Sequence, residues 1–334
     1  MPIDIKMLME NTIYIFVRAL KRSIWNLFNL PKKTKDFGWQ FAIKDTALKI
    51  CFNWTQSPSL FEKKHRNIFL WLEQNYPDEI KKMAHAHLSF EPDRVKRIWV
   101  MWWQGLDNAP VLVKKCTAIL KDKSQDYELV FLDKNNYADY VDIPTYITEK
   151  FNRGKISVAN YSDVIRMALL YKYGGFWIDS TVLVRDGWDK NYSELPFFSI
   201  KNHLTCIDGA VSKFRFATFF MFSKKKNTYF GLIRDFLFDY WKRQESTIDY
   251  MLIDYVMLMI CHHNKEFQDI LDKVPYTNEN VHTLRNHMGE EYTPERFNEL
   301  TKDTQIFKLT YKDFLIPKVR GVKSTIMQYF LEKY

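Results

Sequence analysis

The chain of 334 residues lacks paired cysteines, a long apolar run and a glycine-rich phosphate loop. Its four cysteines, Cys51, Cys116, Cys206 and Cys261, lie far apart and form no CxxC pair, which predicts free thiols in a reducing compartment. No stretch of about 18 apolar residues is present, so no spanning helix is expected. The N-terminus also lacks an uninterrupted apolar signal core with a cleavage site. These absences predict a cytoplasmic protein.

Binding motifs of several familiar kinds are missing as well. The net charge is +9, but its lysines are spread along the chain and no Cys/His ligand pairs or aromatic RNA-binding signature accompany them. We therefore expect no nucleic-acid partner. A basic chain can instead bind an anionic membrane surface or a phosphorylated substrate. The histidines form no HExxH pattern, and the adjacent His262 and His263 do not readily share one helical face, so surface or packing roles are predicted.

The composition favours a folded α/β protein with a helical extension. Hydrophobic residues make up 46% of the chain, enough for a real core, and the 16% of aromatic residues suit sugar or base stacking as well as core filling. Residues 1–92 are expected to form an N-terminal helical region. Residues 93–334 are expected to form the main domain, with a boundary at the proline of Glu91-Pro92-Asp93.

Residues 11–30 have apolar residues at helical spacing and a basic opposite side. Arg18, Lys21 and Arg22 lie on that side, and three further lysines follow at 32, 33 and 35. Such a helix can lie on an anionic membrane. Alternatively, it packs on the domain and leaves its basic face in solvent.

From Val95 onward, apolar strands alternate with helical segments. Strands are predicted over 97–103, 127–133 and 176–178, and helices over 110–121, 146–151 and 159–173. This alternation predicts an α/β fold with a Rossmann-like, mostly parallel sheet and flanking helices. Sheets of this kind bind ligands beyond the carboxyl ends of their strands.

The segment from Ser157 to Val184 carries most of the predicted chemistry. Asn160 or Ser162 can cap the start of its helix. Asp163 lies in the first turn, and Arg166 one turn later can pair with it. The double glycine at 174–175 then ends the helix and turns the backbone into the next strand.

Asp179 emerges at the carboxyl end of that strand. A carboxylate beside an apolar strand is costly unless it has a partner. A divalent cation is one natural partner, because oxygen ligands suit Mg²⁺ or Mn²⁺, which in turn neutralise a diphosphate. The other interpretation is that Asp179 caps the next turn through Ser180 and Thr181.

Two segments together resemble a known family. The run SDVIRMALLYKYGGFWIDST, at 162–181, and the run IWVMWWQG, at 98–105 and followed by Pro110, resemble glycosyltransferase family 32, in particular the bacterial capsular polysaccharide synthesis proteins. The similarity to yeast-type mannosyltransferases and to glucosylating bacterial toxins is more distant. The resemblance implies a GT-A fold, a nucleotide-sugar donor and retention of anomeric configuration.

The resemblance also implies roles for individual residues. Asp163 and Arg166 match positions that hold the donor sugar and ribose, and Tyr173 matches a donor-side aromatic just before the glycines, with Gly175 in the same donor-binding motif. Trp103, or its neighbour Trp102, matches the aromatic residue that stacks on the base.

The metal motif of the family is incomplete in this chain. Asp179 matches its first carboxylate, but Thr181 stands where relatives have the second. Mn²⁺ or Mg²⁺ held by Asp179 and Thr181 is the expected cofactor, with weaker binding because a hydroxyl is neutral.

Three residues further along the chain complete the expected site. Lys308 and Lys312 can bind the donor phosphates if the C-terminal segment folds back over them, or they lie solvated on an ordinary edge strand. Asp254, expected to act in catalysis together with Asp179, can face the acceptor, or it is a structural carboxylate on a half-buried helix.

These features predict a retaining glycosyltransferase that moves a hexose from a nucleotide-sugar, UDP-linked by resemblance, to a lipid-linked oligosaccharide. The acceptor would belong to capsular or exopolysaccharide synthesis, and the protein would be peripheral on the inner face of the cell membrane. Two alternatives are a catalytically inactive, membrane-peripheral scaffold of the same fold and a metal-assisted hydrolase that uses Asp179 and Asp163.

Overall fold

The computed structural model describes residues 5–92, 95–189, 191–203, 211–213, 215–312 and 324–333. Cys51, Cys116 and Cys261 are free thiols, whereas Cys206 lies outside the described residues. Within the described ranges, no helix combines the length and the apolar character needed to cross a bilayer.

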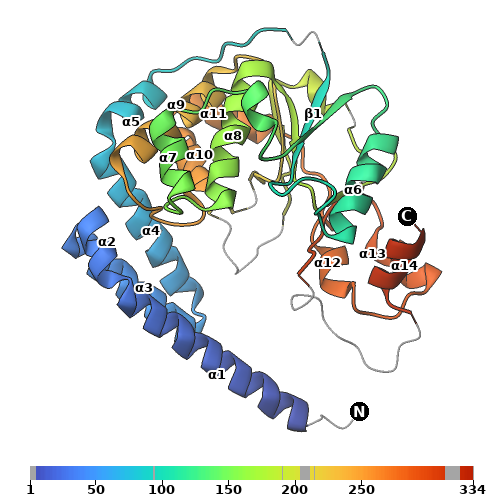
Figure 1. Cartoon of the computed structure of the whole chain (residues 1–334), viewed down its shortest axis with the longest axis horizontal. Coiled ribbons are helices and arrows are strands. Elements are labelled where there is room, and N and C mark those ends of the chain that lie inside the picture. The colour runs from blue at the N-terminus through green and yellow to red at the C-terminus, as the bar shows by residue number, and fades with distance from the viewer. Residues whose placement is uncertain are drawn as a thin grey trace.

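The N-terminal region consists of helices, as predicted. They are α1 (Ile5–Phe28), α2 (Leu30–Phe37), α3 (Trp39–Thr55), α4 (Pro58–Asn75) and α5 (Pro77–Ala84). Helix α1 begins earlier than the predicted residue 11, packs along α3, and extends as a long arm below the body of the molecule (Figure 1). Gly38 separates α2 from α3 with a φ of +85°, a conformation that glycine adopts at little cost.

Helix α1 turns its small and polar residues inward. Ala19, Ser23 and Asn26 are buried. From residue 16 onward, the large apolar side chains of the same helix are exposed: Phe16, Val17, Leu20, Ile24, Trp25, Leu27 and Phe28. Helix α1 thus packs on α3 and leaves its basic side chains in solvent, but the described part of its apolar stripe is exposed as well.

Buried ion pairs join the N-terminal helices to one another and to the main domain. The fully buried Asp45 of α3 contacts Lys33 of α2 at 2.6 Å and Lys49 at 3.0 Å. Lys64 of α4 contacts Asp249, just before α10, at 3.3 Å. Since removing one partner of a buried pair leaves an uncompensated charge, these contacts fix how the helices dock.

The central sheet has five strands in the order β2-β1-β3-β6-β5. They are β1 (Arg97–Met101), β2 (Glu128–Leu132), β3 (Gly175–Ile178), β5 (Phe197–Ser199) and β6 (Phe220–Ser223). Strand β1 pairs in parallel with β2 and β3, with Trp99 opposite both Val130 and Trp177. Strand β6 runs against β3 and β5. The predicted mostly parallel α/β sheet is confirmed, with β6 as the reversed strand.

A separate antiparallel pair of strands lies beside this sheet. Strand β4 (Val182–Val184) pairs with β7 (Ile306–Lys308), and Val182 is the partner of Lys308. This pairing brings residues near the C-terminus next to the segment that follows β3.

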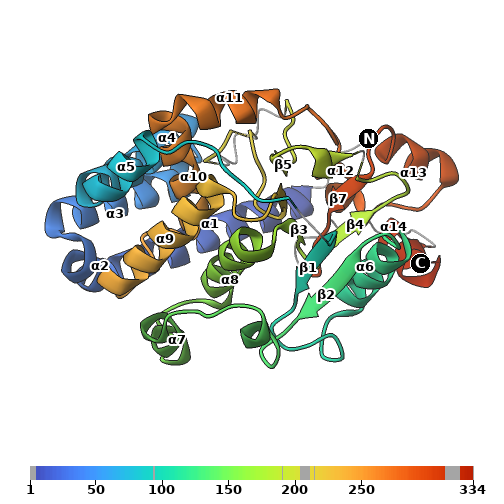
Figure 2. The same ribbon diagram turned by 90° about the horizontal axis from the view of Figure 1, so that it is seen from above.

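Helices cover both faces of the sheet. Those of the main domain are α6 (Val111–Asp122), α7 (Thr145–Asn152), α8 (Val158–Tyr173), α9 (Thr228–Arg243), α10 (Leu252–His263), α11 (Lys265–Lys273), α12 (Thr283–His287), α13 (Pro294–Leu300) and α14 (Ile326–Lys333), with single 3₁₀ turns at Tyr137–Asp139 and Tyr192–Glu194. Figure 2 shows α6 on one side of the sheet and α8 on the other. The three helices predicted before β3 agree with α6, α7 and α8 to within one residue at each end.

Helix α8 is buried along most of its length, between the sheet and α9. Its N-cap is Ser157, whose Oγ accepts from the backbone N–H of Asn160 at 3.1 Å. The predicted caps, Asn160 and Ser162, instead lie inside the helix. At its end, Gly175 has a φ of +94°, and a Cβ there would lie 2.6 Å from the carbonyl oxygen of Arg97, so β1 and β3 approach closely only with glycine at this position.

Candidate active site

A cleft of about 490 Å³ opens at the carboxyl ends of β1 and β3. After β1 the chain passes through α6 to β2 on one side, and it returns through α8 to β3 on the other. The strand order therefore reverses between β1 and β3, and open α/β sheets bind their ligands at such a point. Trp102 and Trp103 line the cleft after β1, Asp179 after β3, and Lys312 after β7.

Arg166 is the central charge of the cleft. Its Nη2 lies 3.3 Å from Asp163 Oδ1 and 3.4 Å from Asp179 Oδ1, so the predicted pair with Asp163 is present. Its Nη1 donates to the carbonyl oxygen of Thr218 at 2.6 Å, and its guanidinium lies 4.7 Å from the ring centre of Trp177. Because Arg166 is buried and held from four sides, its guanidinium is a fixed positive charge.

Asp179 has three donors. Trp177 Nε1 donates to Oδ1 at 2.9 Å, Arg166 contacts the same oxygen, and Lys308 Nζ donates to Oδ2 at 2.6 Å. Burial alone would raise the pKa of this carboxyl, but Lys308 and Arg166 outweigh it and hold the pKa below its usual range. Asp179 is therefore ionised at neutral pH. Its side chain accepts from these three groups rather than capping the following turn.

The ammonium of Lys308 lies between the two residues predicted to bind a metal. Its Nζ is 2.6 Å from Asp179 Oδ2 and donates to Thr181 Oγ1 at 2.9 Å. The pairing of β4 with β7 places the Lys308 side chain at this position.

A divalent cation of this kind requires several oxygen ligands, of which carboxylates supply the charge. Here the carboxylate of Asp179 is already neutralised by the ammonium of Lys308, which also contacts Thr181, and Asp163 is paired with Arg166. A metal on Asp179 and Thr181 would have to displace Lys308. The arrangement does not fit the expected Mn²⁺ or Mg²⁺.

The two other carboxyls of the cleft are readily protonated. Burial raises the pKa of Asp163 to about 6, although Arg166 opposes the shift. Burial, together with the charge of Asp163, raises the pKa of Asp254 to about 7. Asp254 lies in the first turn of α10 and lines the cleft. The cleft therefore combines a permanently ionised carboxylate with two that titrate near neutral pH.

The two tryptophans after β1 have different surroundings. Trp103 packs against the rings of Tyr137, Phe151 and Tyr161, with centroids 4.8 to 5.7 Å away. The ring centroid of Trp102 instead lies 5.2 Å from that of the exposed Tyr311. Trp102 therefore presents the freer of the two rings to the cleft.

Three predicted donor-binding residues do not line this cleft: Lys308, which borders it through its contact with Asp179, and two residues farther away. Tyr173 and Gly175 are at the amino end of β3, and Asp179 follows its carboxyl end. The hydroxyl of Tyr173 donates to the carbonyl oxygen of Tyr140 at 3.0 Å, and its ring packs on Trp99. Their positions give Tyr173 a packing role and Gly175 a role in the close approach of β1.

Some residues of the site were not identified from the sequence. Trp177 of β3 lies two positions before Asp179, and the alternation of side chains along an extended chain is a signal that could have placed it beside that carboxylate. Tyr250 and Tyr311 also line the cleft, and the carbonyl of Thr218 fixes Arg166. These three residues lie in loops, whose sequences have no periodicity from which their positions could be predicted.

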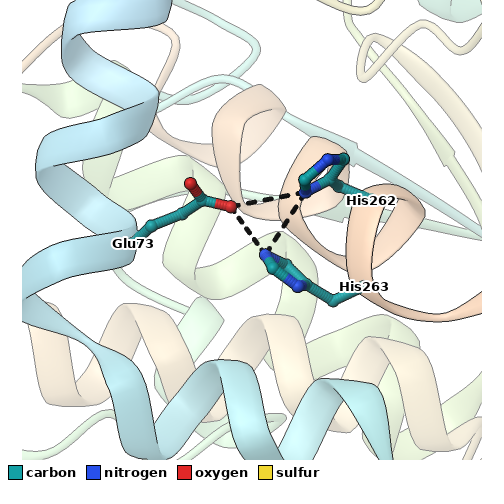
Figure 3. Close-up of side chains that lie close together, drawn as sticks. All are labelled: Glu73, His262 and His263. Carbon is teal, nitrogen blue, oxygen red and sulfur yellow. Dashed lines mark hydrogen bonds and ion pairs between the residues drawn. The ribbon is translucent and has the colours of Figure 1, made fainter.

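The adjacent histidines lie far from this cleft, at the end of α10. Both reach Glu73 of α4: His263 Nε2 is 2.6 Å and His262 Nδ1 is 3.4 Å from Glu73 Oε1 (Figure 3). The sequence argument that two adjacent histidines do not converge is thus wrong for this helix end.

An α/β sheet with a charged cleft at the reversal of its strand order is typical of ligand-binding α/β enzymes, and the comparisons support one class of these, the glycosyltransferases. The chain belongs to the family of capsular polysaccharide synthesis proteins, whose pattern it matches over residues 49–328. That match begins inside the region expected to be a helical extension, so α4 and α5 belong to what the family shares.

Individual relatives match shorter stretches. The chain is 28% identical over 131 residues to the O-glycosyltransferase PaGT of Phomopsis amygdali, covering 35% of this chain and 32% of that protein. It is 30% identical over 95 residues to the O-glycosyltransferase braB of Annulohypoxylon truncatum, covering 25% and 22%. The chain therefore spans a third or less of these relatives. Among solved structures, the PaToxG glycosyltransferase aligns with 13% identity and a TM-score of 0.39, over 74% of this chain and 95% of that one.

Proposed function

We propose that this protein is a retaining glycosyltransferase with a GT-A fold, of the family 32 type. It would transfer a hexose from a nucleotide-sugar, with UDP as the first choice, to a lipid-linked oligosaccharide in capsular polysaccharide synthesis. The observation that carries the proposal is the position of Arg166 between Asp163 and Asp179, at the reversal of the strand order. Membership of the capsular polysaccharide synthesis family supports the acceptor class.

Unpaired donors on the cleft walls favour an oxygen-rich ligand. Within the described part of the chain, Trp102 Nε1 and Arg166 Nε are buried and have no hydrogen-bond partner. A buried donor left unpaired costs about 1–3 kcal/mol. The ribose, sugar and phosphate oxygens of a nucleotide-sugar would satisfy both groups, and the ring of Trp102 would stack on the base.

The charges of the site suit a diphosphate leaving group. Lys308 and Arg166 are both fixed on Asp179, and Lys312 lines the cleft. As the donor bond breaks, negative charge grows on the diphosphate, and preorganised cations stabilise it without having to reorganise. Lys308 would supply, from the protein itself, the positive charge that the sequence assigned to a metal.

The transfer step requires little covalent machinery. The bond between the anomeric carbon and the diphosphate oxygen breaks, and the acceptor oxygen forms its bond on the same face of the sugar. The acceptor proton passes to the departing phosphate oxygen. Asp254, with a pKa near 7, would accept a hydrogen bond from the acceptor hydroxyl and orient it.

The exposed apolar stripe of α1 supports a second partner, an anionic membrane surface. Trp25 and Phe28 are 64% and 80% exposed, and Arg18, Lys21 and Arg22 are exposed on the same helix. A helix with this composition binds a lipid interface by burying its apolar side while its cations meet anionic headgroups. Such binding would hold the enzyme at the inner face of the cell membrane, where a lipid-linked acceptor lies.

A nucleotide panel tests the transferase proposal. Thermal stability of the full chain would be measured with UDP, GDP, ADP and CMP, each with chelator and with Mn²⁺. Binding raises the free energy of unfolding by about 2.7 kcal/mol at a hundredfold excess over the dissociation constant. Stabilisation by one nucleotide, lost in Arg166→Lys, is expected. No stabilisation by any nucleotide would refute the proposed donor site.

A further inference from the structure

A cluster of three potential metal ligands lies at the outer end of α10. It consists of Glu73 from α4 and of His262 and His263 from the last turn of α10 (Figure 3). The two helices contribute ligands that are about 190 positions apart in the sequence. No step of the proposed transfer uses these side chains, so their convergence calls for an explanation of its own.

The ligand atoms are spaced almost as zinc requires. Zinc bound at 2.0–2.1 Å in tetrahedral geometry places neighbouring ligand atoms about 3.3–3.4 Å apart. His262 Nδ1 is 3.4 Å from Glu73 Oε1 and 3.4 Å from His263 Nε2. The third edge, from His263 Nε2 to Glu73 Oε1, is 2.6 Å and would have to open by somewhat less than 1 Å.

The surroundings also suit a cation. The cluster lies at the C-terminus of α10, where the helix dipole favours positive charge. The ring of Phe69 packs edge-on against His262 at 5.6 Å and restricts its orientation. The side chains of Glu73 and His263 are 19% and 26% exposed, whereas that of His262 is 63% exposed. An ion therefore has a route in from solvent, and a water molecule has room for the fourth ligand position.

We propose that Glu73, His262 and His263 form a Zn²⁺ site with water as the fourth ligand. The ion would clamp α4 to α10. Asp254, which lines the cleft, lies in the first turn of α10. The zinc ion would therefore hold the opposite end of the helix that borders the cleft. The site does not depend on the transferase proposal, because no residue is shared between them.

Zinc binding to the full chain would be measured near neutral pH by competition with a chromophoric chelator. We expect the wild-type chain to bind one zinc ion. Glu73→Gln and His263→Ala should each bind zinc at least tenfold more weakly. His262→Ala provides a variant of an exposed side chain whose folding is not at issue. Zinc should also raise the melting temperature of the wild-type chain and not that of His262→Ala.

Two control variants separate this site from ordinary surface binding. His203→Ala removes an exposed histidine that contacts a single carboxylate, Glu279 at 2.8 Å, and Cys51→Ser removes an exposed thiol. Both should bind zinc as the wild type does. Equal zinc binding by the wild type and the three cluster variants, or no binding by the wild type, would overturn the proposal and leave a plain His263–Glu73 hydrogen bond.

Discussion

Lys308→Met tests whether the protein carries its own cation in place of a divalent metal. The substitution keeps an apolar stem of similar length and removes the ammonium that contacts Asp179 at 2.6 Å and Thr181 at 2.9 Å. A hydrogen bond to a charged group contributes about 1.5–3 kcal/mol to stability. The loss should stay within that range, because Asp179 keeps its bonds from Trp177 and Arg166.

The effect on the reaction should be larger than the effect on stability. Removing one preorganised donor from a developing anion costs about 10²–10³ in kcat. We therefore expect the rate of nucleotide release to fall by about that factor, with a smaller change in KM. Lys302→Met, which removes an exposed lysine after α13, is the matched control and should leave the rate unchanged.

The assay compares nucleotide release in chelator and in Mn²⁺. If Lys308 replaces the metal, the wild-type enzyme works in chelator, and Mn²⁺ does not rescue Lys308→Met. Inactivity of the wild type in chelator, with activity regained in Mn²⁺, would refute this role of Lys308, because a metal ion would then take the position of the ammonium.

Four further outcomes are expected. Asp179→Asn should abolish transfer while the chain stays folded by circular dichroism; retained activity would remove this carboxylate from the site. Trp102→Ala should weaken nucleotide binding measured by calorimetry, and unchanged affinity would argue against stacking. The folded-state pKa of Asp254 is raised to about 7 from an unfolded value of about 3.9, so the folded state binds the extra proton between these values and stability falls as pH rises through them. Asp254→Asn should flatten part of that fall in melting temperature between pH 5 and 8, and an identical slope would contradict the shift. Replacing the exposed Trp25 and Phe28 by serine should reduce sedimentation with anionic liposomes, whereas undiminished binding would assign the membrane contact elsewhere.

Local patterns predicted most of the elements, because helix caps, glycines and apolar runs act over a few residues. The segment from Ser157 to Asp179 was interpreted nearly correctly for this reason, apart from the identity of the cap. The family resemblance implied donor-site roles for Tyr173 and Gly175, which lie in the same motif as Asp179. A strand rises about 3.3 Å per residue, so the four steps from Gly175 to Asp179 cover about 13 Å, and the two residues lie at opposite ends of the strand.

Contacts between distant segments could not be predicted in the same way. The position of Lys308 depends on its register with Val182, more than a hundred residues earlier, and a shift of one residue would turn its side chain to the other face. The convergence of Glu73 with His263 depends on how α4 docks on α10. For α1, periodicity indicated two different faces, but only the packing on α3 decided which of them is exposed.

The β4–β7 pair has a consequence for the order in which the protein is made. Chains are synthesised from the N-terminus at about 5–20 residues per second, and earlier segments fold while later ones are still inside the ribosome. The exposed stripe of α1 emerges well before Lys308 and Lys312, which lie far later in the sequence. A nascent chain can therefore reach a lipid surface long before its cleft has the cations that a diphosphate needs. Under the proposed function, activity would begin only after β7 has paired with β4, when α1 has already had time to reach the surface.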